Sequence, residues 1–277
     1  MKICVSIWSV QEDFYANRID TLKFINTMRL WPIDGIELLD YFFKSEVEVE
    51  QAIRLLQAEK IPVAAFSIEV DFTADGPAEF KAQIQYVKDS IDLTNRFGAK
   101  LLRVLNGSTK AGLTQSRSEA FIEAGLRSCL DYAADKGVTL VLENSGVLLG
   151  TSQKLKNMVS LIHSPNLKAN ADIISFLLQR EDPVKAVGNL RNMLGYVHLN
   201  DIRRIKKPNG RLMITAEDNT LYQGTVLGEG EADFPAIIRQ LREIGYDGYL
   251  CIEYEGVGSC LAETRASVDY IRRIAEL

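Results

Sequence analysis

The chain has 277 residues, of which 47% are hydrophobic and 25% are charged, and this composition suits a folded protein with a large apolar core. Its formal net charge of -5 gives no general attraction to polyanions, so the composition disfavours nucleic acid as a partner. No stretch approaches the roughly 18 apolar residues of a membrane span, and the cysteines are too scattered for a metal-binding pair, so we expect a cytoplasmic protein with reduced thiols.

Short apolar runs alternate with amphipathic helical stretches along the chain. The first run is followed by SVQEDF, which lacks the glycine-rich phosphate turn of a doubly wound nucleotide-binding sheet. Eight strands are predicted, at 2–9, 35–41, 61–68, 99–106, 138–144, 167–172, 194–200 and 248–254. Because repeated strand-helix units favour a closed parallel barrel, we predict one α/β domain, a single (β/α)8 TIM barrel, over residues 1–277.

The connection after the seventh predicted strand is unusually long. It covers about 202–231, whereas connections between a strand and the next helix usually have a few residues. We expect this segment either to fold over the site as a lid or to make a subunit contact.

Four side chains that can bind a hard metal ion stand near the ends of the last four predicted strands. They are Glu143, Asp172, His198 and Glu253, which are 29, 26 and 55 residues apart. In a barrel the C-terminal strand ends meet around one site, so residues this distant in sequence can converge. Buried ion pairs would explain any single carboxylate, but four convergent groups favour one divalent metal ion.

Other polar and aromatic residues near strand ends are candidates for the same site. Trp8 could stack on the apolar face of a sugar or pack at the barrel mouth. Arg103 and Asn106 could donate hydrogen bonds to a substrate or hold adjacent loops. Asp201 could orient either the loop or the imidazole of His198, since metal-bound histidines usually have such a partner.

The chain resembles the xylose isomerase-like TIM barrels, the superfamily of sugar phosphate isomerases and epimerases. The resemblance is strongest in two stretches, DPVKAVGNLRNMLGYVHLND and LGEGEADFPAIIRQLREIGYDGYLCIEYEG. The family pattern of Glu, Asp, His and Glu falls on the four residues named above. The resemblance therefore implies one divalent ion, Mn²⁺, Mg²⁺ or Co²⁺, with Zn²⁺ as a further candidate.

The resemblance implies an enzyme, a metal-dependent isomerase or epimerase of a ketose or a sugar phosphate. In the family's epimerases the residues corresponding to Glu143 and Glu253 remove and return a proton, through a metal-stabilised enediolate. The same enediolate can lose a hydroxyl group, so a sugar or inosose dehydratase is an alternative. A barrel that only binds a sugar or a partner protein is another.

The family also provides expectations about binding partners. Arg204 lies where some ketose epimerases of the family carry an arginine that touches substrate oxygens, although a solvated charge is the alternative. The endonuclease branch builds a trinuclear zinc cluster from many histidines, and this chain has two, which disfavours nucleic acid again. Resemblance also favours a homodimer or homotetramer.

Overall fold

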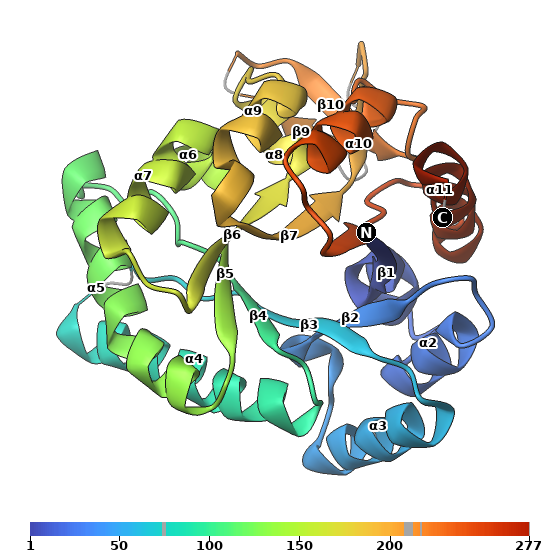
Figure 1. Ribbon diagram of the computed structural model, residues 1–277, viewed down its shortest axis with the longest axis horizontal. Helices are drawn as coiled ribbons and strands as arrows, with labels where there is room; N and C mark the ends of the chain where they lie inside the picture. The colour runs from blue at the N-terminus through green and yellow to red at the C-terminus, as the bar shows by residue number, and fades with distance from the viewer. Residues whose placement is uncertain (74–75, 208–212, 217, 277) are drawn as a thin grey trace.

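A computed structural model describes residues 1–73, 76–207, 213–216 and 218–276 of the chain. Its parallel strands close into a barrel that helices surround, which confirms the predicted (β/α)8 TIM barrel (Figure 1). The first and last barrel strands pair with each other and so close the sheet. The barrel strands are β1 (Lys2–Ser6), β2 (Gly35–Leu39), β3 (Val63–Ile68), β4 (Leu101–Val104), β5 (Thr139–Glu143), β6 (Leu167–Asp172), β7 (Leu194–Leu199) and β11 (Tyr249–Ile252).

Long helices cover the outside of the barrel, and most begin at a side chain that accepts a hydrogen bond from the first turn. They are α2 (Thr21–Met28), α3 (Glu46–Glu59), α4 (Pro77–Arg96), α5 (Gln115–Asp135), α7 (Ser152–Ile162), α9 (Pro183–Leu190), α10 (Phe234–Glu243) and α11 (Cys260–Ala275). Among the helices that the structure describes, none is long and apolar enough to cross a membrane.

Shorter helices lie at the ends of several strands, where they shape the loops. The α-helical ones are α1 (Gln11–Tyr15), α6 (Gly146–Leu149) and α8 (Ile173–Leu178), and the 3-10 turns are η1 (Ile7–Val10), η2 (Asp40–Phe42) and η3 (Arg191–Met193). Because η1, η2 and α8 directly follow barrel strands and α6 begins shortly after β5, they bring backbone and side chains close to the C-terminal end of the barrel.

The interior of the barrel has an apolar layer beneath a polar one. Cys4, Val141, Tyr196 and Cys251 belong to one buried cluster with alanines of β3, and the Cys4 thiol lies 3.2 Å from the Tyr196 hydroxyl. Side chains two residues further along a strand point to the same side. A second layer of inward-pointing side chains therefore lies next to this one, nearer the C-terminal ends of the strands. Those side chains are Ser6, Glu143, His198 and Glu253.

The long connection after β7 contains a small antiparallel sheet. It is formed by β8 (Asp201–Arg204), β10 (Leu221–Thr225) and β9 (Met213–Thr215), in that order. Ile202 and Tyr222 of this sheet pack against Ile174 of α8. Within the predicted connection, residues 208–212 and 217 lie outside the described residues. A role as lid or subunit contact stays a prediction.

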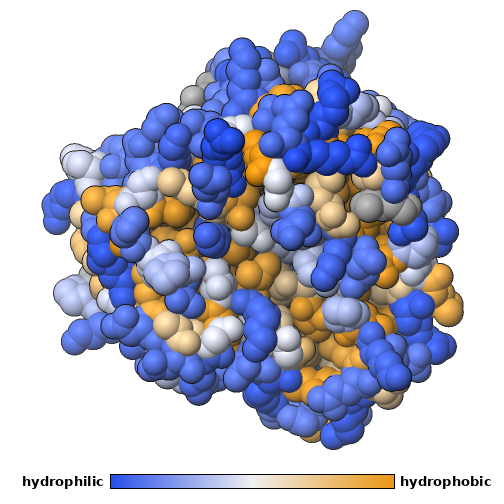
Figure 2. Space-filling model, in the orientation of Figure 1, coloured by the Kyte–Doolittle hydropathy of each residue, from blue (hydrophilic) through white to orange (hydrophobic). Residues whose placement is uncertain are grey.

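The molecular surface is mainly hydrophilic on the face shown in Figure 2, with smaller hydrophobic areas among the polar side chains. The large hydrophobic side chains that are exposed belong to different elements of the described chain. They are Tyr15, Leu30, Val47, Val147, Leu161 and Met213. Such a scattered set does not define one contact face, so the oligomeric state also stays a prediction.

A glycine in α5 anchors the loop that follows β3. Phe72 of this loop is fully buried, and a Cβ atom at Gly125 would overlap its ring. By contrast, a Cβ atom at Gly188 in α9 would lie 3.3 Å from the flexible end of Gln240. Gly125 is therefore required by packing, whereas Gly188 is not.

We predict opposite effects of alanine at these two helical positions. Gly125→Ala should lower the free energy of unfolding by about 1–3 kcal/mol because the core is overpacked. Gly188→Ala, the matched control, should raise it by up to about 1 kcal/mol because alanine favours the helix. Urea unfolding measures both changes, and a stabilised Gly125→Ala variant would contradict the packing argument.

Candidate metal centre and active site

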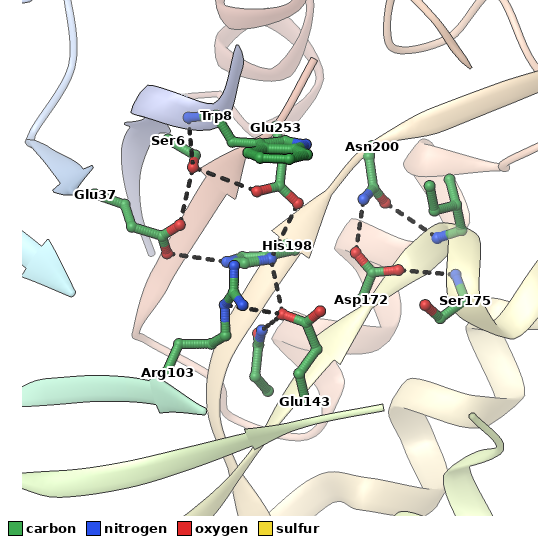
Figure 3. Close-up of polar contacts among 12 residues, drawn as sticks. Ser6, Trp8, Glu37, Arg103, Glu143, Asp172, Ser175, His198, Asn200 and Glu253 are labelled. Carbon is green, nitrogen blue, oxygen red and sulfur yellow. Dashed lines mark hydrogen bonds and ion pairs between the residues drawn. The ribbon is translucent and has the colours of Figure 1, made fainter. Parts of the chain in front are cut away.

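His198 lies in the middle of a buried polar cluster inside the barrel, near the C-terminal ends of its strands (Figure 3). Its Nε2 atom lies 2.9 Å from Oε2 of Glu37. Its Nδ1 atom lies 3.2 Å from Oε2 of Glu143 and 3.3 Å from Oε2 of Glu253. The strands β2, β5, β7 and β11 thus bring three carboxylates around one imidazole.

The two nitrogens of this ring have different environments. Nε2 with its proton can donate to Glu37, which leaves the lone pair of Nδ1 directed toward two carboxylates. Within the described residues, no group makes a well-directed hydrogen bond with Nδ1. A buried lone pair among negative oxygens needs a positive charge, which either a proton or a metal ion can supply. The residues therefore fit a bound cation.

The pKa of His198 also reflects the negative charge around the ring. Burial alone would lower the pKa of the imidazole, but the charges of Glu37 and Glu253 outweigh it and raise the pKa well above its usual range. We expect an imidazolium when no metal is bound. A metal ion at Nδ1 would displace that proton.

The Glu143 carboxylate is held by two donors. Its Oε2 accepts a hydrogen bond of 2.7 Å from Nδ2 of Asn170 and lies 3.3 Å from Nε of Arg103. Burial would raise the pKa of Glu143, but the charges of Arg103 and His198 lower it below its usual value. Glu143 is therefore ionised at neutral pH.

Glu253 and Glu37 share a serine donor. The Ser6 hydroxyl lies 2.9 Å from Oε1 of Glu37 and 3.3 Å from Oε1 of Glu253. Burial would raise the pKa of Glu37, but its contacts with His198 lower it to about 2. Glu37 thus stays negative and can hold the imidazole in one orientation, as a carboxylate often does for a metal-bound histidine.

Asp172 ends β6 and also caps the following helix. Its Oδ1 accepts from the Ser175 amide at 2.8 Å, and its Oδ2 accepts from Nδ2 of Asn200 at 2.6 Å. Burial and the charges of Glu143 and Glu253 raise the pKa of Asp172 to about 7. Asp172 is therefore partly protonated near neutral pH unless a cation binds beside it.

Ligand atoms of Glu143, Asp172 and His198 lie within 4.8 Å of one another, all on buried side chains. A second such group consists of Glu37, His198 and Cys251. The first group is the better metal site because its Nδ1 atom needs a cation, whereas Nε2 of His198 is already paired with Glu37.

A cavity of about 170 Å³ opens next to these carboxylates. It is lined by Trp8, Glu69, Arg103, Leu105, Glu143, Ser145, Glu253 and Glu255. Figure 3 shows the Trp8 indole beside Glu253, and its ring makes an edge contact with Tyr41 at a centroid distance of 6.0 Å. The structure thus brings Trp8 and Arg103 to the cavity together with Glu143 and Glu253.

Arg204, for which the sequence analysis expects a substrate contact, lies away from the described wall of the cavity. Its Nε lies 2.9 Å from Oε1 of Glu231, its guanidinium lies over the Tyr222 ring, and its side chain is 58% exposed. Arg204 is not part of the cavity wall. The physical reason is that β8 leaves the barrel and joins the small sheet, which carries Arg204 away from the strand ends.

Asn106 is buried, and it holds a loop. Its Nδ2 lies 3.3 Å from the carbonyl oxygen of Glu143 and 3.1 Å from that of Ser145. Of the two roles expected for it, contact with the chain after β5 is the one that the hydrogen bonds support. Its donors are used there, and the side chain does not line the cavity.

Asp201 does not orient the imidazole, and this corrects one of its two expected roles. Its carboxylate accepts from the amides of four residues, Ile202, Gly228, Gly230 and Ala232. Burial raises the pKa of Asp201, while these backbone donors lower it. Asp201 thus holds the turn before α10, and Glu37 is the partner of His198.

Two supporting residues were not assigned from the sequence, namely Asn170 and Asn200. Glu37 lies in GIELL, where a carboxylate in an otherwise apolar strand is itself a signal. Asn170 and Asn200 each lie two residues from a predicted ligand, and strand alternation puts the former on the same side as Asp172. That they donate hydrogen bonds to the carboxylates of the site follows only from the distances in the structure.

Residues 29–274 match the family described as the xylose isomerase-like TIM barrel, and the chain belongs to this family. This match covers most of the chain, so it includes seven of the barrel strands and all four predicted ligands.

Curated relatives cover only part of the chain. The inosose dehydratase of Clostridium perfringens is 27% identical over 138 residues, which are 47% of this chain and 45% of that protein. An uncharacterized protein of Methanocaldococcus jannaschii is 28% identical over 158 residues, which are 54% of this chain and 48% of that protein. The chain thus spans about half the length of the curated relatives it matches.

Solved structures with the same fold include several sugar epimerases. A D-tagatose 3-epimerase-like protein has a TM-score of 0.77 at 20% identity, with coverage of 100% of this chain and 99% of the other. An L-ribulose 3-epimerase has a TM-score of 0.78 at 18% identity, with coverage of 99% and 94%. A probable 3-DHS dehydratase of Bacillus anthracis has a TM-score of 0.76 at 19% identity, with coverage of 98% of both chains. At these identities the likeness establishes the shared fold.

We predict that metal affinity increases with pH. Binding must displace the proton on Nδ1 of His198, and below about pH 7 also the proton of Asp172. The dissociation constant for Mn²⁺ should therefore rise about tenfold for each unit of acidification, and more steeply below about pH 7. Titration followed by the electron paramagnetic resonance of free Mn²⁺ measures this slope.

Two variants complete the titration. Asp172→Asn should weaken Mn²⁺ binding, and the dissociation constant should lose its steeper pH dependence below about pH 7. Glu243→Gln, an exposed residue of α10, should retain the original slope. An affinity that does not change with pH in the unmodified protein would contradict the proposed proton displacement.

Proposed function

We propose that this chain is a divalent-metal-dependent enzyme that epimerises or isomerises a ketose-like sugar by moving a proton next to a carbonyl group. The observation that carries the proposal is the position of two carboxylates at one buried imidazole nitrogen. Glu143 and Glu253 contact Nδ1 of His198 from different strands, and both line the cavity (Figure 3).

The metal ion would be held by Glu143, Asp172, Glu253 and Nδ1 of His198. Three carboxylates and one imidazole suit Mn²⁺, Mg²⁺ or Co²⁺, with Zn²⁺ as a further candidate. When bound, such an ion polarises a substrate carbonyl and stabilises the negative charge that develops on its oxygen. Glu37 keeps the imidazole oriented through its contact with Nε2.

The proton transfers are assigned to Glu143 and Glu253. A general base must be ionised at the working pH, and the Arg103 guanidinium keeps the pKa of Glu143 low. One carboxylate would accept the proton of the substrate carbon, and the other would return a proton to the same or the adjacent carbon. Trp8 would cover the apolar face of the sugar at the cavity wall.

A second candidate is a dehydratase that uses the same residues. This reading is favoured by the inosose dehydratases among the curated relatives, at 22% to 28% identity over about half of the chain. Proton removal would be the same first step, and loss of a hydroxyl group on the next carbon would follow it. The two candidates differ in whether water is released.

We predict metal-dependent exchange of a substrate C–H proton with solvent deuterium. Proton NMR in D2O should detect it with the Mg²⁺-loaded protein and a panel of ketoses and inososes, and chelator should abolish it. Glu143→Gln and Glu253→Gln should each reduce exchange by about 10² to 10⁴-fold because each removes an acid-base group. Glu243→Gln on α10 serves as the matched control and should retain the full rate.

The metal content of each variant must be measured with its rate. Wild-type exchange by either glutamine variant with full metal content would contradict the two-carboxylate mechanism. Release of water with formation of a new carbonyl compound would assign the dehydratase instead. An exchange rate that chelator does not change would contradict the metal requirement.

A further inference from the structure

The cavity wall is strongly acidic. Among its described lining residues, four are glutamates, Glu69, Glu143, Glu253 and Glu255, and one is a cation, Arg103. The formal charge of this wall is therefore -3, and a bound divalent ion would bring it to -1. Burial and the charge of Glu253 raise the pKa of Glu255 well above its usual range, and with Glu255 protonated the wall and the ion together would carry no net charge.

Arg103, the one arginine among the described wall residues, already pairs with a carboxylate. Arg103 is buried, its Nε lies 3.3 Å from Oε2 of Glu143, and its Nη1 lies 3.4 Å from the carbonyl oxygen of Ile68. The charges of Glu143 and Glu37 raise the pKa of Arg103 despite the opposing effect of burial. The guanidinium thus balances the carboxylates of the site, and a phosphate group would have to compete with them.

One of the usual places for a phosphate in a TIM barrel, the loop after the eighth strand, is acidic among the described residues of this chain. Such sites are frequently formed by the loops after the seventh and eighth barrel strands. After the eighth strand, β11, the cavity is lined by Glu253 and Glu255. After the seventh strand, β7, Arg204 is paired with Glu231 away from the cavity.

Three of the described wall residues suit a neutral polyol. Glu69 directly follows β3, is exposed, and lies 3.5 Å from the Tyr41 hydroxyl, so its carboxylate can accept hydrogen bonds from hydroxyl groups. Trp8 and Leu105 provide apolar surface for the C–H face of a sugar ring. These residues provide hydrogen-bond acceptors and apolar surface, and none of them carries a positive charge that would bind a phosphate.

We propose that the cavity selects uncharged polyhydroxy carbonyl compounds over their phosphate esters, and that Glu69 is a carboxylate that enforces this choice. The inference rests on the proposed function, since it concerns the substrate class of the same site. Carboxylates that face a phosphate repel it, whereas they bind hydroxyl groups, so the discrimination needs no additional contact.

The test compares matched ligand pairs on the Mg²⁺-loaded protein. The pairs are D-fructose with D-fructose 6-phosphate, and D-xylulose with D-xylulose 5-phosphate. Because the chain has two tryptophans, a Trp31→Phe background leaves Trp8 in the cavity as the fluorescent reporter of binding. We expect each neutral sugar to bind at least about tenfold more tightly than its phosphate ester.

Charge variants identify the residues responsible. Glu69→Gln should lower the preference for the neutral sugar, measured as the Kd of the phosphate ester divided by the Kd of the neutral sugar, several-fold. The reason is that it removes one negative charge from the wall. Asp131→Asn makes the same charge change on the exposed side of α5 and should leave the ratio unchanged. Equal or tighter binding of the phosphate esters, or an unchanged ratio in Glu69→Gln, would overturn the inference.

Binding and exchange are recorded on the same samples, which separates the two proposals. Selective binding of the neutral sugars without any C–H exchange would support the charge selection and contradict the proposed catalysis of these compounds. Exchange with the phosphate esters at equal or higher kcat/KM would support the catalysis and overturn the selection. If no member of either pair binds, the inference fails as well.

Discussion

The lone pair of Nδ1 on His198, buried between two carboxylates, is the constraint on which the site depends. Removing such a cluster from water costs several kcal/mol unless a positive charge compensates it. The protein supplies one permanent cation, Arg103, and leaves the second place to a proton or a metal ion. The perturbed pKa of Asp172 has the same origin, because a further carboxylate beside this cluster is fully ionised at neutral pH only when a cation is present.

The barrel makes this cluster possible by its regular geometry. Alternation along parallel strands puts one apolar layer, which includes Cys4 and Tyr196, beneath one polar layer. The apolar layer excludes water from below, so the electrostatic interactions above it are strong. The cavity lies at the C-terminal ends of the strands, where Trp8 and Glu69 belong to its wall. The proposed metal binding and the proposed substrate selection would therefore both follow from one distribution of charge.

Much of this arrangement could be predicted from the sequence because the pattern of hydrophobic and charged residues shows where the strands end. Hydrophobic runs located all eight barrel strands, and a charged residue at the end of such a run, as at Glu143, indicated the site. Partners that depend on loop paths could not be predicted this way. Asp201 is close to His198 in sequence but faces a turn, and Arg204 follows a strand that leaves the barrel. Glu37 is 161 residues from His198, so only the closed barrel brings them together.

The central claim is that Nδ1 of His198 carries a cation, a proton without metal and a metal ion when one is bound. Protein labelled with 15N-histidine tests it directly by NMR, since the chain has two histidines and His163 serves as the internal reference. We predict that both ring nitrogens of His198 are protonated in the metal-free protein. Addition of Mg²⁺ should remove the proton from Nδ1 alone and leave His163 unchanged. A neutral His198 whose Nδ1 signal does not respond to Mg²⁺ would contradict the account.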